Sequence, residues 1–492
     1  MSYNNNNEQS CSPCGVVVGC YEDMKEWSTL GSEINSKTND ALINAFRLSD
    51  NKGKSGDSLL VYNVTPEFPR VAIVGLGKFG NTCSIYEQGE NIRRAVGKGV
   101  KSLKAAGATK IAVDTSIGEL RACSEGAHLS VFKYEIKSTS KNITYDIQPY
   151  QPEKLASLQA WEDGKVLADA QNFARRLADT PANLMTPTIF VQQVKEKFQA
   201  LESSGKVEII AHDRKWAEEK KMGMFLGVAV GSDEPPIFLE INYRAAQDKT
   251  APPVVYVGKG VTFDTGGISL KPPAAMGLMR GDMQGAAVTV SSIYAAATLG
   301  LNVNLTVLTP LTENMPSGKA TKPGDVLIAA NGMTIEVDNT DAEGRLILGD
   351  ALHYAHTFNP VTIVDVATLT GAMDIALGAH LYGCFAGSDE LWQEIDSCGQ
   401  YTGERPWRMP LLKEYRKQLD SKYADMVNSA GRSGGACAAA MFLKEFVQID
   451  RWAHLDIAGV SYTTEDGPYI VKGMTGKPVR TLVELARRHF NK

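Results

Sequence analysis

The sequence predicts an α/β protein of two domains, a smaller N-terminal α/β domain and a larger C-terminal domain with a mixed, largely parallel sheet covered by helices. Short apolar runs alternate with segments of helical periodicity along the 492-residue chain. In the second half the apolar runs are continuous, which is typical of strands buried on both faces of a sheet. The hydrophobic content of 43% and charged content of 22% are ordinary for a globular protein.

The first 14 residues are polar and rich in asparagine, so residues 1–14 are predicted to be a disordered tail. The N-terminal α/β domain is expected over residues 15–155. Its predicted elements are three strands, a helix and a fourth strand, at Gly15–Gly19, Ser58–Val64, Val71–Gly77, Glu90–Gly107 and Lys110–Asp114.

A long helix is predicted to connect the two domains over residues 156–180. Apolar residues at Val166, Ala170, Phe173 and Leu177 have the spacing of one buried helical stripe. The prolines of TPANLMTP end this helix. The remaining residues, 181–492, form the larger domain.

The larger domain contains the continuous apolar strands. Small-residue helices separate them, such as Gly285–Gly300. The predicted strands are Val254–Gly258, Leu301–Leu311, Val361–Gly371 and Trp452–Gly459.

The net charge of −5 gives no support to nucleic-acid binding. The sequence has no apolar run long enough for a membrane helix, and its start lacks the core of a signal peptide, so we expect a cytoplasmic protein. Eight cysteines scattered over a chain of this length do not form a disulfide framework. Cys11 and Cys14 form a CxxC pair, but no second pair follows to complete a zinc site.

A glycine pattern follows one predicted strand of the N-terminal domain. Gly75, Gly77 and Gly80 have the spacing of a dinucleotide-binding fingerprint, which makes a nucleotide-binding oxidoreductase one hypothesis. The next clear helix is expected only near Glu90, and Ala95 stands where an acidic residue would be needed. An ordinary turn at the end of a strand is therefore favoured.

The stretch VDNTDAEGRLILGDAL, residues 337–352, places acids directly before an apolar run. One interpretation is a solvated turn that caps a helix, because Asn339, Thr340 and Asp341 are good N-cap residues. The other is a cluster of oxygen ligands that includes Asp341 and Glu343. Under that interpretation the apolar run anchors a helix in the core while the preceding turn faces a metal.

A second polar stretch, GKGVTFDTGGISLK, follows the strand Val254–Gly258 and holds Lys259, Asp264 and Lys271. Ligands in open α/β sheets bind beyond the carboxyl ends of strands, which favours this position for chemistry. Downstream, Asp282 lies at the edge of an alanine-rich helix, where it could also serve as an N-cap.

Four acids thus lie on glycine-rich turns beside predicted buried strands: Asp264, Asp282, Asp341 and Glu343. No histidine is close in sequence, and carboxylate oxygens suit hard or borderline divalent ions. Two divalent cations would balance the four negative charges. Paired metals are a common hydrolytic device.

These residues, together with the octapeptide NTDAEGRL, resemble the leucyl aminopeptidase family of the cytosolic type. The resemblance runs from about residue 15 to the C-terminus and is densest over residues 257–379. It implies two divalent metal ions per subunit, with Asp264 and Glu343 bridging them, Lys259 and Asp282 completing a tighter site and Asp341 a looser one. Zinc is expected, with manganese, magnesium or cobalt possible at the exchangeable site.

The resemblance also implies a mechanism and partners. Lys271 would polarise the scissile carbonyl, Arg345 would hold a bicarbonate that moves a proton, and the nucleophile would be a metal-bridging hydroxide. The expected activity is release of leucine and other bulky apolar residues from peptide N-termini by a homohexamer whose C-terminal domain is catalytic. A non-catalytic structural member of the same fold is the alternative.

By the same resemblance, the substrate pocket would be lined by Met279, Thr368, Gly371 and Ala458. Ser461 stands where relatives can carry methionine, which could widen the pocket or make it more polar. Other departures lie at residues that are not proposed ligands: Thr265, Gly277, Gly281 and Gly349. Gly349, inside a predicted helix, should cost up to about 1 kcal/mol relative to alanine.

Overall fold

The computed structural model describes residues 15–80, 84–140, 143–151, 155–156 and 158–489. The predicted tail, with Cys11 and Cys14, lies outside them. The chain divides into two compact units, and the division falls within one helix, between Asp169 and Ala170. Unit 1 comprises residues 1–169 and 465–471, and unit 2 comprises residues 170–464 and 472–492. None of the helices within the described ranges is long and apolar enough to cross a membrane.

Unit 1 contains a five-stranded sheet with the order β2-β3-β1-β4-β5. All neighbouring strands are parallel except the antiparallel pair β2 and β3. The strands are β1 Gly15–Cys20, β2 Ser58–Tyr62, β3 Arg70–Gly75, β4 Lys110–Val113 and β5 Asp146–Pro149. The α-helices are α1 Thr29–Lys37, α2 Ala41–Leu48, α3 Ile85–Ala105 and α4 Leu120–Ser130, with short 3-10 turns η1 Glu22–Met24 and η2 Thr115–Ile117.

Helix α3 begins earlier than the expected start near Glu90. Ser84 accepts a hydrogen bond from the Glu87 backbone amide, and the Glu87 side chain accepts one from the Ser84 amide, which is a capping box. The glycine-rich turn that precedes α3 forms backbone hydrogen bonds with an earlier loop of unit 1. Gly75 N donates to Asp57 O, and Gly77 N donates to Gly53 O. These bonds give the glycine spacing a structural role.

Helix α5 (Gln159–Asp179) occupies the region where the connecting helix is expected. Unit 2 is built on a nine-stranded mixed sheet with the order β15-β14-β17-β13-β8-β10-β7-β6, and β9 pairs with β10. Its strands are β6 Val207–His212, β7 Ile237–Arg244, β8 Val254–Gly258, β9 Gly260–Asp264, β10 Asn304–Asn314, β13 Thr362–Ala367, β14 Tyr382–Ala386, β15 Pro406–Arg408 and β17 Trp452–Asp456.

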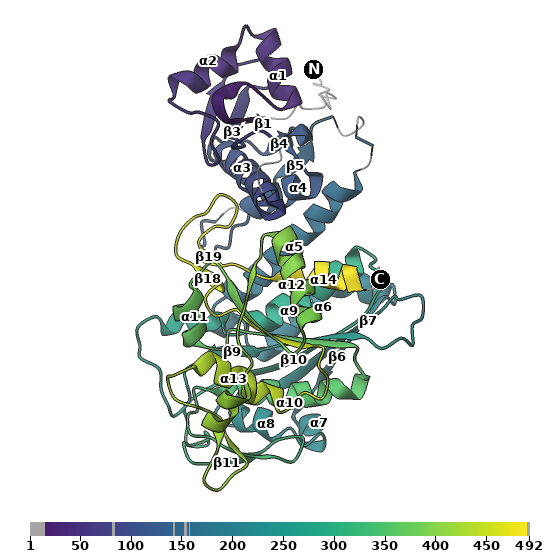
Figure 1. Cartoon of the computed structure of the whole chain (residues 1–492), viewed down its shortest axis with the longest axis vertical. Coiled ribbons are helices and arrows are strands. Elements are labelled where there is room, and N and C mark those ends of the chain that lie inside the picture. The colour runs from purple at the N-terminus through teal and green to yellow at the C-terminus, as the bar shows by residue number, and fades with distance from the viewer. Residues whose placement is uncertain (1–14, 81–83, 141–142, 152–154, 157, 490–492) are drawn as a thin grey trace, which may run out of the picture. The chain divides into compact units, whose positions relative to one another are not determined.

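The centre of this sheet, β17-β13-β8-β10, is parallel, and antiparallel pairs lie toward both edges. The α/β class with a mixed, largely parallel sheet is therefore confirmed. Figure 1 shows α9, α12 and α14 on one side of the sheet and α8, α10 and α13 on the other. The α-helices are α6 Pro187–Ser203, α7 Arg214–Glu219, α8 Gly223–Ala229, α9 Gln284–Thr298, α10 Glu343–Ala355, α11 Gly371–Leu377, α12 Asp389–Thr402, α13 Gly435–Lys444 and α14 Val479–His489.

Smaller elements complete unit 2. Two minor sheets consist of β11 Val326–Ile328, β12 Thr334–Glu336 and β16 Met426–Val427, and of β18 Tyr462–Thr463 and β19 Gly473–Met474. The 3-10 turns are η4 Ala182–Leu184, η5 Met276–Gly281, η6 His356–Phe358 and η7 Lys413–Leu419. Five described cysteines are buried and form no disulfide: Cys20, Cys123, Cys384, Cys398 and Cys437.

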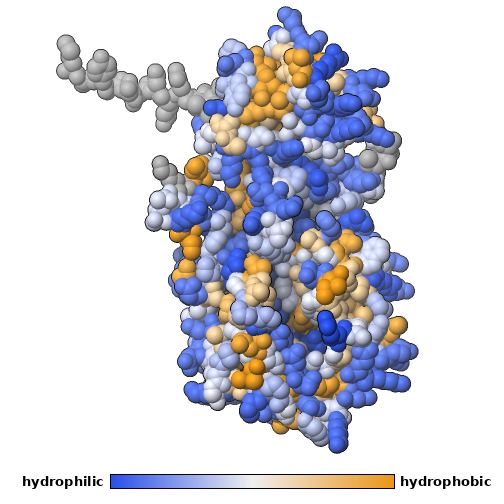
Figure 2. Space-filling model, turned by 90° about the vertical axis from the view of Figure 1, so that its left-hand side faces the viewer, coloured by the Kyte–Doolittle hydropathy of each residue, from blue (hydrophilic) through white to orange (hydrophobic). Residues whose placement is uncertain are grey.

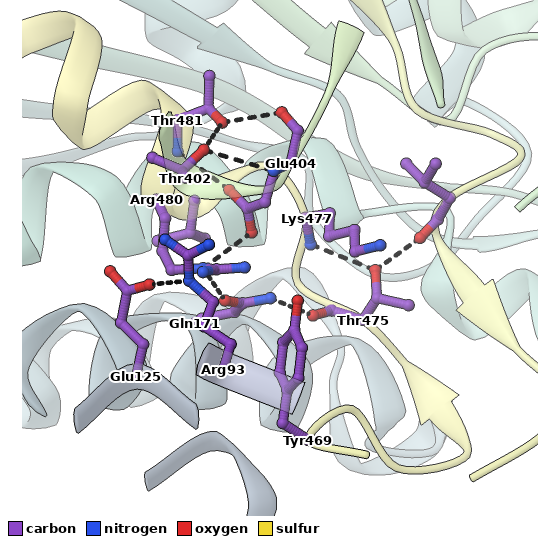
Figure 3. Close-up of polar contacts among 12 residues, drawn as sticks. Arg93, Glu125, Gln171, Thr402, Glu404, Tyr469, Thr475, Lys477, Arg480 and Thr481 are labelled. Atoms are coloured by element: carbon purple, nitrogen blue, oxygen red, sulfur yellow. Dashed lines mark hydrogen bonds and ion pairs between the residues drawn. The ribbon is translucent and has the colours of Figure 1, made fainter. Parts of the chain in front are cut away.

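The helices over one face of the unit 2 sheet are fastened by a buried polar network. Arg480 Nε on α14 donates to Gln171 Oε1 on α5 at 2.9 Å and lies 3.4 Å from Glu404 Oε1. Thr481 N donates to Glu404 Oε2 at 3.0 Å, and the Thr481 hydroxyl bonds to that of Thr402 at the end of α12. Figure 3 shows these contacts converging from α5, α12 and α14.

The opposite face of the sheet carries α10, whose Gly349 is explained by packing. An added Cβ would lie 2.6 Å from Met224 Cε and 3.1 Å from ring carbons of Phe446.

We predict that Gly349→Ala lowers the thermal unfolding midpoint. The helix-propensity gain of about 1 kcal/mol is outweighed by overpacking, which costs about 1–3 kcal/mol. In a Met224→Ala background, which removes the nearest methyl group, the same change should be tolerated better. A more stable Gly349→Ala protein in the wild-type background would contradict this account.

Candidate active site

The residues predicted for chemistry gather at the carboxyl edge of the parallel strands of unit 2. Lys259 directly follows β8, Asp264 is the last residue of β9, and Thr368 directly follows β13. Because parallel strands present their carboxyl ends to one edge, residues far apart in sequence meet there. The backbone of Lys259 is also fixed by hydrogen bonds. Its carbonyl accepts from Ala286 N, and its amide donates to Val366 O.

The acids that could have been helix caps do not act as caps. The N-cap of α10 is Ala342 and that of α9 is Met283, and neither makes a side-chain capping bond. Asp341 instead contacts the Lys271 ammonium, and Asp282 Oδ2 lies 2.8 Å from Lys259 Nζ. The capping interpretation of these two acids is therefore wrong, because their side chains turn away from the helix ends and toward a shared cluster.

The cluster brings three carboxylates close together. Ligand oxygens of Asp264, Asp341 and Glu343 lie within 4.8 Å of one another. Lys259 Nζ lies 2.8 Å from Glu343 Oε1, and Lys271 Nζ lies 2.7 Å from Asp264 Oδ2. Glu343 Oε2 is buried and has no hydrogen-bond or ion-pair partner among the described residues. An unpaired buried carboxylate oxygen beside two other carboxylates fits a site for divalent cations.

Burial and mutual repulsion perturb these groups strongly. Burial, together with the Asp264 charge, raises the pKa of Glu343 to about 8, although Lys259 opposes it. Burial raises the pKa of Asp282 to about 6 against the opposing Lys259 charge. Burial disfavours the ammonium of Lys259, but Asp282, Glu343 and Asp264 outweigh it and raise the pKa of that lysine. The cluster therefore needs positive charge, and the two lysines supply part of it.

Glycines make the close approach to this cluster possible. A Cβ on Gly344 would lie 2.7 Å from both Cε and Nζ of Lys259, so only glycine leaves room for the lysine. Gly266 adopts a φ of 88°, and its Cβ would lie 2.9 Å from Asp341 Oδ1. Both glycines stand where a side chain would displace a residue of the cluster.

Arg345 lies beside the cluster on the first turn of α10 and is only 8% exposed. One terminal nitrogen donates to the Asn428 carbonyl at 2.8 Å, whereas Nε has no hydrogen-bond partner among the described residues. Burial lowers the pKa of this guanidinium to about 10, against the opposing charges of Glu343 and Asp456. Arg345 therefore remains a cation with an unused donor near neutral pH.

Two asparagines that the sequence analysis did not single out hold the ligand residues in place. Asn314, at the end of β10, donates to Asp264 Oδ1 at 2.8 Å and to the Thr340 carbonyl at 3.1 Å. Asn428 Oδ1 accepts from the amides of Asp338 and Asn339, and its Nδ2 donates to the carbonyls of Asn339 and Ala342. Asn428 thereby pins the turn that carries Asp341. No spacing signal could have revealed either residue, because both act through contacts distant in sequence.

A pocket of about 830 Å³ opens next to the cluster. Its lining includes the cluster residues Lys259, Asp264, Lys271, Asp282, Asp341 and Arg345. It also includes Ser461 and the four residues expected to bind substrate, Met279, Thr368, Gly371 and Ala458. Glu343 is not among the lining residues, because it lies beneath them with 1% exposure.

The pocket combines a charged floor with an apolar side. Leu278, Met279 and Ile375 are among its lining residues, and Ile375 is 86% exposed. On the face of unit 2 in Figure 2, hydrophobic residues lie in separate patches between hydrophilic ones. An apolar group could therefore bind on one side while a polar group reaches the carboxylates.

Comparisons with known proteins agree with this geometry. Residues 172–483 match the model of the cytosol aminopeptidase family, catalytic domain, and residues 17–140 match that of its N-terminal domain. The chain is 57% identical to the cytosol aminopeptidase of Dictyostelium discoideum over 483 residues, 96% of this chain and 93% of that protein. Among solved structures, the bottromycin maturation enzyme BotP in complex with Mn is 32% identical with a TM-score of 0.84, covering 97% of this chain and 99% of that chain.

The solved structure of a mutant tomato leucine aminopeptidase is 30% identical with a TM-score of 0.84, covering 99% of this chain and 95% of that chain. The two family models and the aminopeptidase relatives concern peptidases, and together the matches extend over most of the sequence. The chain is a peptidase and belongs to the cytosol aminopeptidase family.

Proposed function

We propose that this peptidase is a metal-dependent aminopeptidase that releases leucine and other bulky apolar residues from peptide N-termini. The observation that carries the proposal is the convergence of three carboxylates within 4.8 Å, with an unpaired buried oxygen of Glu343, at the floor of a peptide-sized pocket. A non-catalytic member of the fold would be expected to lack at least one ligand, and all the expected ligands are present.

Five residues would hold two divalent ions: Lys259, Asp264, Asp282, Asp341 and Glu343. Zinc is the proposed native metal, with manganese, magnesium or cobalt accepted at the exchangeable site, and the solved structure of a relative in complex with Mn supports manganese as one of these ions. The four carboxylates balance the charge of two dications only if Lys259 is neutral when it acts as a ligand. When bound, the ions would activate a water molecule as the hydroxide that attacks the peptide carbonyl.

The two remaining cations have separate proposed roles. Lys271 is about one-fifth exposed and lines the pocket, so its ammonium can reach the substrate carbonyl and stabilise the negative charge that develops on its oxygen. Arg345 keeps a free Nε donor in a buried position beside the pocket. We assign it a planar anion such as bicarbonate, which can accept and return a proton during hydrolysis.

Substrate selection is assigned to the apolar side of the pocket. Met279, Thr368, Gly371 and Ala458 line it, and Gly371 has open space where a Cβ would stand. Ser461 adds a hydroxyl that donates to the Ala458 carbonyl at 2.8 Å and is therefore satisfied within the chain.

We further propose a cytoplasmic homohexamer on the family resemblance alone, and a monomer in sedimentation experiments would contradict it.

We predict that exhaustive chelation abolishes hydrolysis of leucyl peptides and that zinc, manganese or cobalt restores it. Glu343→Gln should lose several orders of magnitude in turnover and retain less metal, because it removes one charge and one ligand from the cluster. Elemental analysis and kinetics of the same samples check this. Glu336→Gln, which alters a carboxylate bonded to Ser421 and Tyr423 outside the pocket, should keep both metal and rate. Turnover of Glu343→Gln within about tenfold of wild type, near 1.4 kcal/mol in barrier, would refute the assignment.

A panel of substrates that differ only in the N-terminal residue tests the pocket. We expect kcat/KM to rise from alanine to leucine and methionine in graded steps, because each methylene in such a pocket is worth about 1–3 kcal/mol. A maximum at aspartate or glutamate would be incompatible with an apolar pocket above a carboxylate cluster.

The role of Arg345 is tested by depleting bicarbonate. Arg345→Ala should lower turnover, retain both metal ions, and remove any dependence of rate on added bicarbonate, because the planar donor is lost. Arg345→Lys keeps the charge without the planar fork and should give an intermediate rate. Loss of metal from Arg345→Ala, with a wild-type rate that ignores bicarbonate, would instead indicate a purely structural arginine.

A further inference from the structure

A buried carboxylate outside the ligand cluster connects two of the loops that line the pocket. Asp456 is the last residue of β17 and is fully buried. Its Oδ1 accepts from the amides of Leu369 and Ala458, both at 3.2 Å, and at 3.5 Å from the amide of Thr370. Its Oδ2 accepts from the Thr370 hydroxyl at 2.6 Å. One side chain thus joins the loop after β13 to the loop after β17.

The Thr370 hydroxyl links Asp456 to helix α11, which forms part of the pocket wall. Thr370 is the N-cap of α11, and its Oγ1 accepts from Met373 N at 3.1 Å while it donates to Asp456. The first turns of α11 supply further lining residues, including Gly371 and Ile375. The position of this wall therefore depends on the chain of bonds from Asp456 through Thr370 to α11.

The same loop contacts the cluster on its other side. The Thr368 carbonyl accepts from Lys259 Nζ at 3.1 Å, and the Thr368 hydroxyl donates to Asp282 Oδ1 at 2.7 Å. The loop is consequently tied to the proposed metal ligands at Thr368 and to Asp456 at Leu369 and Thr370. Asp456 itself is not among the residues that line the pocket.

We propose that Asp456 is a positioning residue that sets the apolar wall of the pocket relative to the ligand cluster, and thereby the selection of bulky N-terminal residues. The inference rests on the proposed aminopeptidase function. A carboxylate is required because three amides and one hydroxyl point at it, and it offers two acceptor oxygens. An asparagine would turn its NH₂ group toward either an amide or the hydroxyl, leaving a buried donor unpaired.

A neighbouring buried carboxylate shows how a purely structural role would differ. Asp365, opposite His454 on the adjoining strand, bonds to His454 Nδ1 at 2.5 Å and accepts from Trp452 Nε1 at 2.8 Å. These partners lie within the sheet and neither lines the pocket. The hydrogen-bond partners of Asp456, in contrast, are all residues that line it.

The test compares Asp456→Asn with Thr370→Val, which removes the hydroxyl and so both its bond to Asp456 and its cap on α11, and with Thr370→Ser, which retains both. Asp350→Asn is the matched control, because Asp350 is also fully buried and accepts from the amides of Phe225 and Ala330 but lines no part of the pocket. Each purified, metal-loaded protein is assayed for metal content, thermal midpoint, and kcat and KM on leucyl and alanyl substrates. Binding of a non-hydrolysable leucyl dipeptide analogue is measured alongside.

We expect Asp456→Asn and Thr370→Val to retain both metal ions but to raise KM for the leucyl substrate and weaken binding of the analogue, each by roughly tenfold, as loss of a hydrogen bond to a charged group allows. The preference for leucine over alanine should fall by a similar factor. Thr370→Ser should stay near wild type, and Asp350→Asn should lose stability without a change in KM or preference.

The inference is overturned if Asp456→Asn behaves like Asp350→Asn, with lower stability alone, or if it loses metal. If Asp456→Asn does not fold, Thr370→Val decides, and wild-type KM and preference in that variant overturn the inference. A wild-type enzyme that fails to hydrolyse any aminoacyl substrate would instead overturn the proposed function, whatever the variants do.

Discussion

The site depends on keeping four carboxylates close together although they are largely buried from water. Four carboxylates meet where the central strands of unit 2 end, and burial together with mutual repulsion raises the pKa values of Glu343 and Asp282. Such a cluster is stable only when cations lie among the oxygens. Lys259 and Lys271 do so, and the absence of a side chain at Gly344 admits the first of them. The strand ends and turns around the cluster hold these carboxylates and lysines at short distance from one another.

Neutral side chains keep several of the ligand residues in place. Asn314 orients Asp264, and Asn428 fixes the turn before α10 through bonds to four backbone groups. Amides suit this purpose because they add donors and acceptors without adding charge. Asp456 is the exception, an additional carboxylate kept one layer behind the pocket, whose hydrogen bonds come from amides and a hydroxyl.

Much of this arrangement could be read from the sequence, for identifiable reasons. Continuous apolar runs marked the central strands, and acids on glycine-rich turns after them marked the cluster. Asp282 and Asp341 satisfied N-cap preferences equally well, so local sequence could not decide between a cap and a ligand. The early start of α3 was missed because its signal is the Ser84–Glu87 capping box rather than apolar periodicity. Asn314, Asn428 and Asp456 could not be found, since their partners are brought near only by the folded sheet.

The segment 465–471 has a consequence for the order in which the protein is made. It belongs to unit 1, where Tyr469 bonds to Glu90 and Lys101 donates to the Gly467 carbonyl, yet residues 472–492, including α14, return to unit 2. During synthesis from the N-terminus, neither unit has all its residues until the chain beyond residue 464 has emerged from the ribosome. Contacts of very long sequence separation, such as that between Lys101 and the Gly467 carbonyl, can therefore form only late in translation, and contacts of this kind slow folding.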